Sequence, residues 1–140
     1  GPDREALRAF RDRTGSFDAV RLVGHRSDAA ELMSTFDVLW NGSLYEGQSN
    51  TILEAMTLGI PTVATNIPGT RDLIEHAKTG YLYPAGDLGA LTRSTVALLQ
   101  DDRLRAQMGE QARLRAIQYF SLEQMVQSHE RLYLRLLDSR

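Results

Sequence analysis

The stretch VLWNGSLYEGQSNTILEAMTLGIPTVAT, residues 38–65, decides the fold of this 140-residue chain. Residues 38–40 are apolar and residues 62–65 are rich in β-branched side chains, and both runs are typical of strands. Between them, apolar residues recur at helical spacing over residues 51–58, and Gly59 is placed to end that helix. A strand, a helix and a second strand in this order predict a parallel α/β sheet.

The same alternation extends over the rest of the chain. The other expected elements are helices around residues 6–10, 29–36, 71–75, 88–99, 104–112 and 122–137, and strands at 20–23 and 81–83. Asp28 with Glu31, and Ser121 with Gln124, have the spacing of capping boxes. The apolar stripes of the last helices, with His129 among them, predict packing faces. We therefore expect one α/β domain over residues 1–140, with a Rossmann-like parallel sheet and flanking helices.

Composition excludes several functional classes. The chain is 42% hydrophobic and 24% charged, has a formal net charge of −2 and contains no cysteine. Such values are ordinary for a globular protein, and they argue against a nucleic-acid partner, disulfides and thiolate zinc sites. The three histidines share no metal-ligand spacing, and no apolar run approaches the roughly 20 residues that span a bilayer.

Residues 43–54 carry the chemistry. They join a strand end to a helix start, and ligands of open α/β sheets bind at this edge. The polar loop after Gly47 leads into a helix N-terminus, which suits an anion such as a diphosphate. Glu46 and Glu54 flank that position, and a carboxylate accepts two hydroxyl protons from a vicinal diol. The pattern favours a nucleotide sugar, while two ordinary surface charges and a simple helix cap remain the alternative.

These residues resemble the retaining glycosyltransferases called "glycosyl transferases group 1". The two glutamates, Glu46 and Glu54, match the paired-glutamate motif of that family, with seven residues between them. Further matches are Gly47, Leu53, Ala55-Met56, Gly59-Ile-Pro61, Val63-Ala-Thr65, Pro68-Gly69, Gly80-Tyr-Leu, Gly86-Asp87 and Phe120-Ser121. Gly1-Pro2 and Gly24 upstream also fit, so the resemblance covers nearly the whole chain.

The resemblance implies a role for each site residue. Glu46 is expected to act in catalysis by binding hydroxyls of the donor sugar, and Glu54 to hold the ribose hydroxyls. His25 and Arg26 are expected near the nucleotide base. The amides that line the diphosphate pocket are those of Gly47, Gln48, Ser49, Asn50 and Thr51. Many relatives carry an aromatic residue where this chain has Gln48-Ser49-Asn50, so the identity of the donor stays open.

The resemblance also implies a reaction and its partners. A sugar moves from a nucleotide diphosphate to a hydroxyl of a glycan or lipid-linked acceptor, with retained anomeric configuration. No metal or other cofactor is expected, and the location is cytoplasmic, including the cytoplasmic face of the membrane.

Compared with the C-terminal domain of this two-domain fold, called GT-B, the chain lacks the first two strands and the cations that neutralise the diphosphate. We therefore expect residues 1–140 alone to be inactive. The absent strands would lie between the strand at residues 20–23 and the strand at 38–40, so either those two re-pair or another chain fills the gap. Exposed sheet edges invite such self-association.

Two other functions remain open on the sequence. A nucleotide-sugar epimerase such as a hexosamine 2-epimerase shares the GT-B fold. The second possible function is a non-catalytic module that forms oligomers, because the expected cations for the diphosphate are absent.

Overall fold

The computed structural model describes residues 3–138, so Gly1 and Pro2 lie outside the described residues. A three-stranded parallel sheet occupies the centre. Its strands are β1 (Leu39–Asn41), β2 (Thr62–Thr65) and β3 (Gly80–Tyr83), in the order β1-β2-β3. The parallel α/β sheet expected from the sequence is confirmed.

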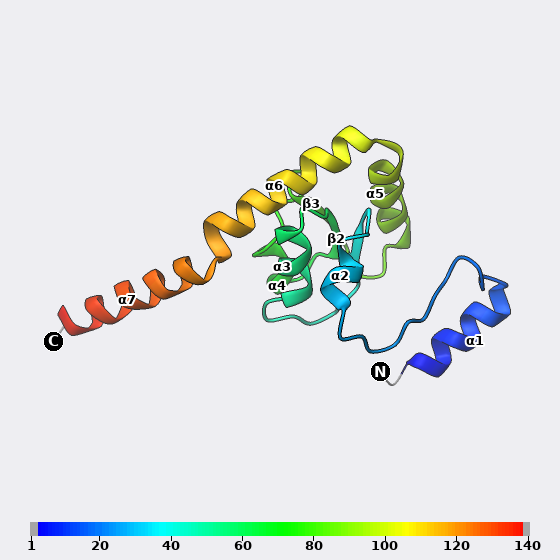
Figure 1. The fold of residues 1–140 in the computed structure, drawn as a ribbon, viewed down its shortest axis with the longest axis horizontal. Coiled ribbons are helices and arrows are strands. Elements are labelled where there is room, and N and C mark those ends of the chain that lie inside the picture. The colour runs from blue at the N-terminus through cyan, green and yellow to red at the C-terminus, as the bar shows by residue number, and fades with distance from the viewer. Residues whose placement is uncertain (1–2, 139–140) are drawn as a thin grey trace.

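The described residues contain seven helices. They are α1 (Arg4–Thr14), α2 (Ala29–Met33), α3 (Asn50–Thr57), α4 (Pro68–Arg71), α5 (Leu88–Gln100), α6 (Asp102–Phe120) and α7 (Leu122–Asp138). Figure 1 shows α3 and α5 on different sides of the strands, with the long helix α6 crossing between them. Successive residues of a strand face opposite sides of the sheet. Accordingly Ala64 packs in one buried cluster with Ile52 of α3, and Val63 in another with Leu98 of α5.

α4 begins before the expected helix at residues 71–75. Pro68 occupies its first turn, a position where the missing proline N–H costs no hydrogen bond. The hydroxyl of Thr70 accepts the Ile67 N–H at 3.2 Å and lies 2.9 Å from the Ile67 carbonyl oxygen. Pro68-Gly69 is therefore the start of a short helix.

The expected strand at residues 20–23 does not form. Among residues 3–138 no strand lies beside this segment, and β1 pairs only with β2. A strand is stabilised by its hydrogen-bonded neighbour, so this segment remains irregular although its side chains favour a strand. The re-pairing of residues 20–23 with 38–40 is therefore wrong for this structure.

The capping boxes are corrected as well. Asp28 does not cap α2, because its carboxylate accepts a hydrogen bond from Arg26 at 2.7 Å instead. That hydrogen bond holds the pKa of Asp28 below its ordinary value. Ser121 forms half of its box, since its hydroxyl accepts the Gln124 N–H at 3.3 Å.

The last helix does not bury its apolar stripe, contrary to expectation. α7 has no buried residue, and Leu122, Met125 and Tyr133 are each more than half exposed. Figure 1 shows α7 projecting from the end of α6, away from the sheet. An amphipathic pattern predicts a packing face only where a partner element is present, and within residues 3–138 none covers this one.

Candidate functional site

The carboxyl edge of the sheet gathers the loops that carry the expected site. In a parallel sheet all strands end at the same edge, so Asn41, Thr65 and Tyr83 lie there together. Residues 42–49, here called the site loop, leave that edge after β1 and lead into α3. The stretch that the sequence selected therefore lies where open α/β sheets bind ligands.

Side chains at the strand ends hold the site loop in place. The side chain of Asn41 accepts the Ser43 N–H at 3.1 Å and donates to the Ser49 hydroxyl at 3.2 Å. The Thr65 hydroxyl donates to the Ser43 carbonyl. Ser49 is only 4% exposed, so the loop is fixed at both of its ends.

Tyr83 supports the first residue of the loop. Its ring is buried, and burial raises the pKa of its phenol. The hydroxyl lies 3.6 Å from the position that a Cβ on Gly42 would occupy. A neutral, packed phenol thus lies under the start of the site loop.

The N-terminus of α3 presents free donors. Ser49 precedes the helix with an extended backbone, but its side chain caps no helical N–H. The first helical hydrogen bond runs from the Leu53 N–H to the Ser49 carbonyl. Among residues 3–138, the N–H groups of Asn50, Thr51 and Ile52 therefore have no acceptor.

The loop ahead of α3 adds further donors. The N–H groups of Gly47 and Gln48 also have no acceptor among the described residues. A Cβ on Gly47 would meet no atom within 4 Å, so the space beside this glycine is open. Free amides at the positive end of a helix dipole form an anion site.

The two glutamates lie on either side of these amides in the chain. Glu46 is half-buried in the site loop, and Glu54 is exposed on α3. Within residues 3–138 neither carboxylate accepts a hydrogen bond or forms an ion pair, in contrast to Glu75 and Glu110, which pair with basic side chains. Both carboxylates are thus available to hydroxyl groups of a ligand.

Comparisons with known proteins decide the family. The family model described as "Glycosyl transferases group 1" matches residues 1–101. The chain belongs to this family. The membership of this glycosyltransferase family, expected from the paired glutamates and the other motifs, is therefore confirmed.

Individual glycosyltransferases of the family are similar over most of the chain. N-acetyl-alpha-D-glucosaminyl L-malate synthase of Bacillus anthracis is 34% identical over 116 residues, which are 83% of this chain and 30% of that protein. The capsular polysaccharide glycosyltransferase CapM of Staphylococcus aureus is 29% identical over 81% of this chain and 30% of its own length. The chain thus spans about a third of these relatives.

A solved structure also matches most of this chain and about a third of its own length. The crystal structure of Anabaena Alr3699/HepE in complex with UDP-glucose has a TM-score of 0.82 and 27% identity, and the match covers 97% of this chain and 36% of that one.

The residues expected near the nucleotide base form no described hydrogen bond or ion pair with the site loop. His25 and Arg26 lie in the irregular segment before α2, and Arg26 is engaged with Asp28. Among residues 3–138 no hydrogen bond or ion pair connects them to the site loop or to α3. Glu46 and the amides share one loop that leads into the helix of Glu54, whereas His25 and Arg26 lie in another segment, and the roles of all these residues stay predictions.

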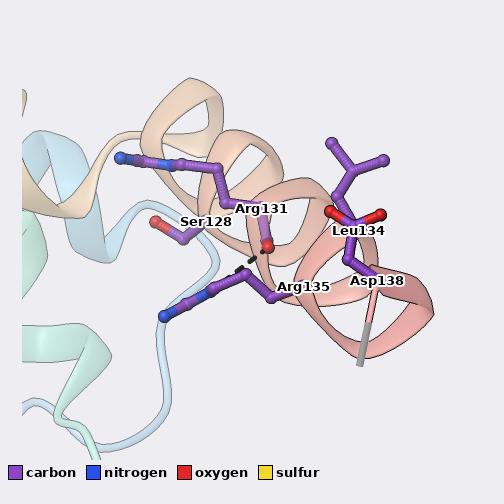
Figure 2. Close-up of a pocket in the computed structure, with 5 residues that line it drawn as sticks. All are labelled: Ser128, Arg131, Leu134, Arg135 and Asp138. Carbon is purple, nitrogen blue, oxygen red and sulfur yellow. Dashed lines mark hydrogen bonds between the residues drawn. The ribbon is translucent and has the colours of Figure 1, made fainter. Parts of the chain in front are cut away.

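The hollows of the surface do not coincide with the site loop. One lies along α7 and is lined by Ser128, Arg131, Leu134, Arg135 and Asp138. Figure 2 shows that these side chains all come from a single helix, so this hollow is an open surface rather than an enclosed pocket. The geometry of the free amides and carboxylates locates the candidate site better than these hollows do.

Sequence reasoning missed the residues that hold the loop. Thr65 and Gly69 contact the site loop from segments that are distant in the chain, whereas Asn41 binds residues two and eight positions further along. The one sequence signal that could have found Asn41 is a polar residue at the end of an apolar strand. The described residues contain no cluster of three or more metal-binding side chains, and no described helix is long and apolar enough to cross a membrane.

Proposed function

We propose that the chain is the donor-binding part of a glycosyltransferase that transfers a sugar from a nucleotide diphosphate. The amides of residues 47–51 hold the diphosphate, since they are free donors at a helix N-terminus. Glu54 accepts the ribose hydroxyls, and Glu46 accepts hydroxyls of the donor sugar during catalysis. The observation that carries this proposal is the run of free N–H groups with an unpaired carboxylate at each side.

The similarity to the Anabaena protein in complex with UDP-glucose supports a nucleotide sugar as the ligand. Glu46 and Glu54 differ in burial, and this fits two different hydroxyl partners. The half-buried Glu46 is the better placed to act on a desolvated sugar, because water screens its charge less. The reaction retains the anomeric configuration, which an NMR measurement of the product anomer tests. It uses no metal, which a transfer assay in the presence of a chelator tests.

Residues 1–140 alone bind the donor but do not transfer the sugar. A departing diphosphate requires cationic or hydrogen-bonding stabilisation. The segment 41–70, which runs from the end of β1 to α4, contains no lysine or arginine. A cation for the diphosphate must therefore come from outside residues 41–70. A cytoplasmic location and a glycan or lipid-linked acceptor remain predictions for the complete enzyme.

Calorimetric titration with UDP, GDP and ADP tests the donor site. Glu54→Ala removes a charged acceptor, and hydrogen bonds to charged groups contribute about 1.5–3 kcal/mol. The dissociation constant should therefore rise roughly 10- to 100-fold for the nucleotide that binds. Glu130→Ala, which removes an exposed glutamate of α7, is the matched control and should change nothing. Equal affinities for wild type and Glu54→Ala would contradict the ribose contact.

The unpaired edge of β1 favours self-association as a second candidate function. β1 pairs with β2 on one side only, and the described residues cover its other edge with no strand. An unpaired edge is a template for another chain. The Leu39 N–H donates to the Pro61 carbonyl beside β2, so the backbone of Trp40 faces the free edge. Sedimentation velocity tests this proposal: a dimer that dissociates when proline replaces Trp40 supports edge pairing, and a monomer at all concentrations contradicts it.

A further inference from the structure

The start of α4 is packed against the site loop without any space between them. Gly69 is buried in the first turn of α4. A Cβ at this position would lie 2.5 Å from the carbonyl oxygen of Gly47 and 2.8 Å from the carbonyl carbon of Glu46. The Glu46 carbonyl oxygen would be closer still. These atoms belong to the backbone, so they cannot rotate away as a flexible side chain can.

The direction of those carbonyls fixes the direction of the free amides. In a trans peptide unit the C=O of one residue and the N–H of the next point to opposite sides. The carbonyl oxygens of Glu46 and Gly47 are directed at Gly69, since the oxygen of Glu46 lies nearer to it than its carbon. The N–H groups of Gly47 and Gln48 therefore point away from α4, and among residues 3–138 they have no acceptor.

The turn that carries Gly69 is rigid, so it cannot yield to a larger side chain. The Thr70 hydroxyl is bonded to the Ile67 N–H and lies within reach of the Thr65 and Ile67 carbonyls. At the other end of α4, the guanidinium of Arg115 donates to the Asp72 carbonyl at 3.0 Å and to the Leu73 carbonyl at 2.8 Å. A clash at Gly69 would consequently displace the site loop.

We infer that Gly69 is a positioning residue of the donor site: the absence of a side chain there lets the Glu46 and Gly47 carbonyls turn toward α4 and so directs the following N–H groups to the ligand. This inference rests on the proposed donor-binding function. Gly69 itself touches no ligand, and its effect passes through the backbone of the site loop. Thr65 is its partner, because its hydroxyl holds the Ser43 carbonyl of the same loop.

Gly69→Ala and Gly80→Ala form a matched pair. A Cβ at Gly80 would also meet a backbone oxygen at 2.5 Å, that of Thr62, but Gly80 begins β3 and lies at the opposite edge of the sheet. Both variants should lose stability through the same kind of clash. Gly42→Ala is a second control within the site loop, since its Cβ would make ordinary contact with the Tyr83 hydroxyl at 3.6 Å.

The experiment compares amide NMR spectra of the 140-residue chain without ligand, then titrates UDP at equal concentrations of folded protein. Gly69→Ala should shift the amide signals of residues 44–51, whereas Gly80→Ala and Gly42→Ala should leave them in place. The clash requires the site loop to move, and loss of one hydrogen bond to the charged diphosphate corresponds to roughly a 10- to 100-fold loss of affinity. We expect UDP affinity to fall at least 10-fold relative to Gly80→Ala.

The outcomes separate this inference from the proposed function. Unchanged amide signals in Gly69→Ala would overturn the inference. Shifted amide signals in Gly69→Ala together with a UDP affinity equal to that of Gly80→Ala would overturn it as well. Shifted signals in a protein whose wild type binds no nucleotide would leave the positioning intact and overturn the donor site. If Gly69→Ala does not fold, Thr65→Val keeps the side-chain volume and removes only the anchor to Ser43. It should shift the same amide signals, and its failure to do so would also overturn the inference.

Discussion

Arg115 clamps α6 to the turn after α4, and its replacement by lysine tests how the parts of the domain are held together. Its guanidinium donates to the carbonyls of Leu73 and Asp72 at 2.8 and 3.0 Å and to the carboxylate of Glu75. A planar guanidinium reaches three acceptors at once, whereas a lysine ammonium on a flexible stem is a single point charge. Arg115→Lys therefore keeps the charge and loses the geometry.

The magnitude follows from burial. The Arg115 side chain is 19% exposed, whereas Glu75 is 38% exposed, so water screens the ion pair and lysine retains part of it. The two carbonyl contacts are lost, and hydrogen bonds to charged groups contribute about 1.5–3 kcal/mol each. Water partly replaces the contact at Asp72, which is exposed. We expect the free energy of unfolding to fall by about 2–3 kcal/mol.

Urea unfolding measures this loss, with Arg113→Lys as the control on the same helix. The Arg113 side chain is 43% exposed, and within residues 3–138 it pairs with Glu110 alone, one turn away, so its replacement should cost less than about 0.5 kcal/mol. Equal urea midpoints for Arg115→Lys and Arg113→Lys, with unchanged slopes, would refute the stabilising role of the Arg115 contacts.

Two further predictions concern stability. Ile52→Ala removes a fully buried side chain from the contact between α3 and the sheet, so the free energy of unfolding should fall by about 2–5 kcal/mol in urea titration, and a loss below 1 kcal/mol would contradict the assigned core. The hydrogen bond from Lys78 lowers the pKa of Glu75 from its ordinary value of 4.5, burial opposes this, and the nearby Arg115 adds to it. A lowered pKa in the folded state stabilises the protein above pH 4.5 and loses that contribution as pH falls through the folded pKa. Glu75→Gln should therefore unfold with a weaker pH dependence below 4.5, and an identical pH profile for both proteins would exclude this contribution.

The central βαβ unit could be predicted from the sequence because its signals are local. β2 has the expected bounds, and α3 agrees within one residue, since a β-branched run and a glycine at a helix end act through neighbouring residues. The strand at residues 20–23 and the burial of α7 were wrong because each depends on a partner element that no local pattern reports.

The candidate site likewise combines residues with a local sequence signal and residues that act through contacts between distant segments. Glu46, Glu54 and the amides could be selected from the sequence because one short stretch of the chain carries them all, and their role as a donor site stays a prediction. Gly69 appeared in the sequence only as part of a motif, because its contact with Glu46 and Gly47 crosses between two loops. His25 and Arg26 were assigned through the family resemblance, and their role stays a prediction because Arg26 is described only in a hydrogen bond with Asp28.

The most direct test of the central claim is a map of nucleotide binding on the isotopically labelled chain by amide NMR during titration with UDP. The account predicts that the amide signals of residues 47–51 and of Glu54 shift most, while those along α7 between Ser128 and Asp138 stay in place. Shifts confined to the hollow on α7, or no shift at millimolar UDP, would contradict a donor site at the N-terminus of α3.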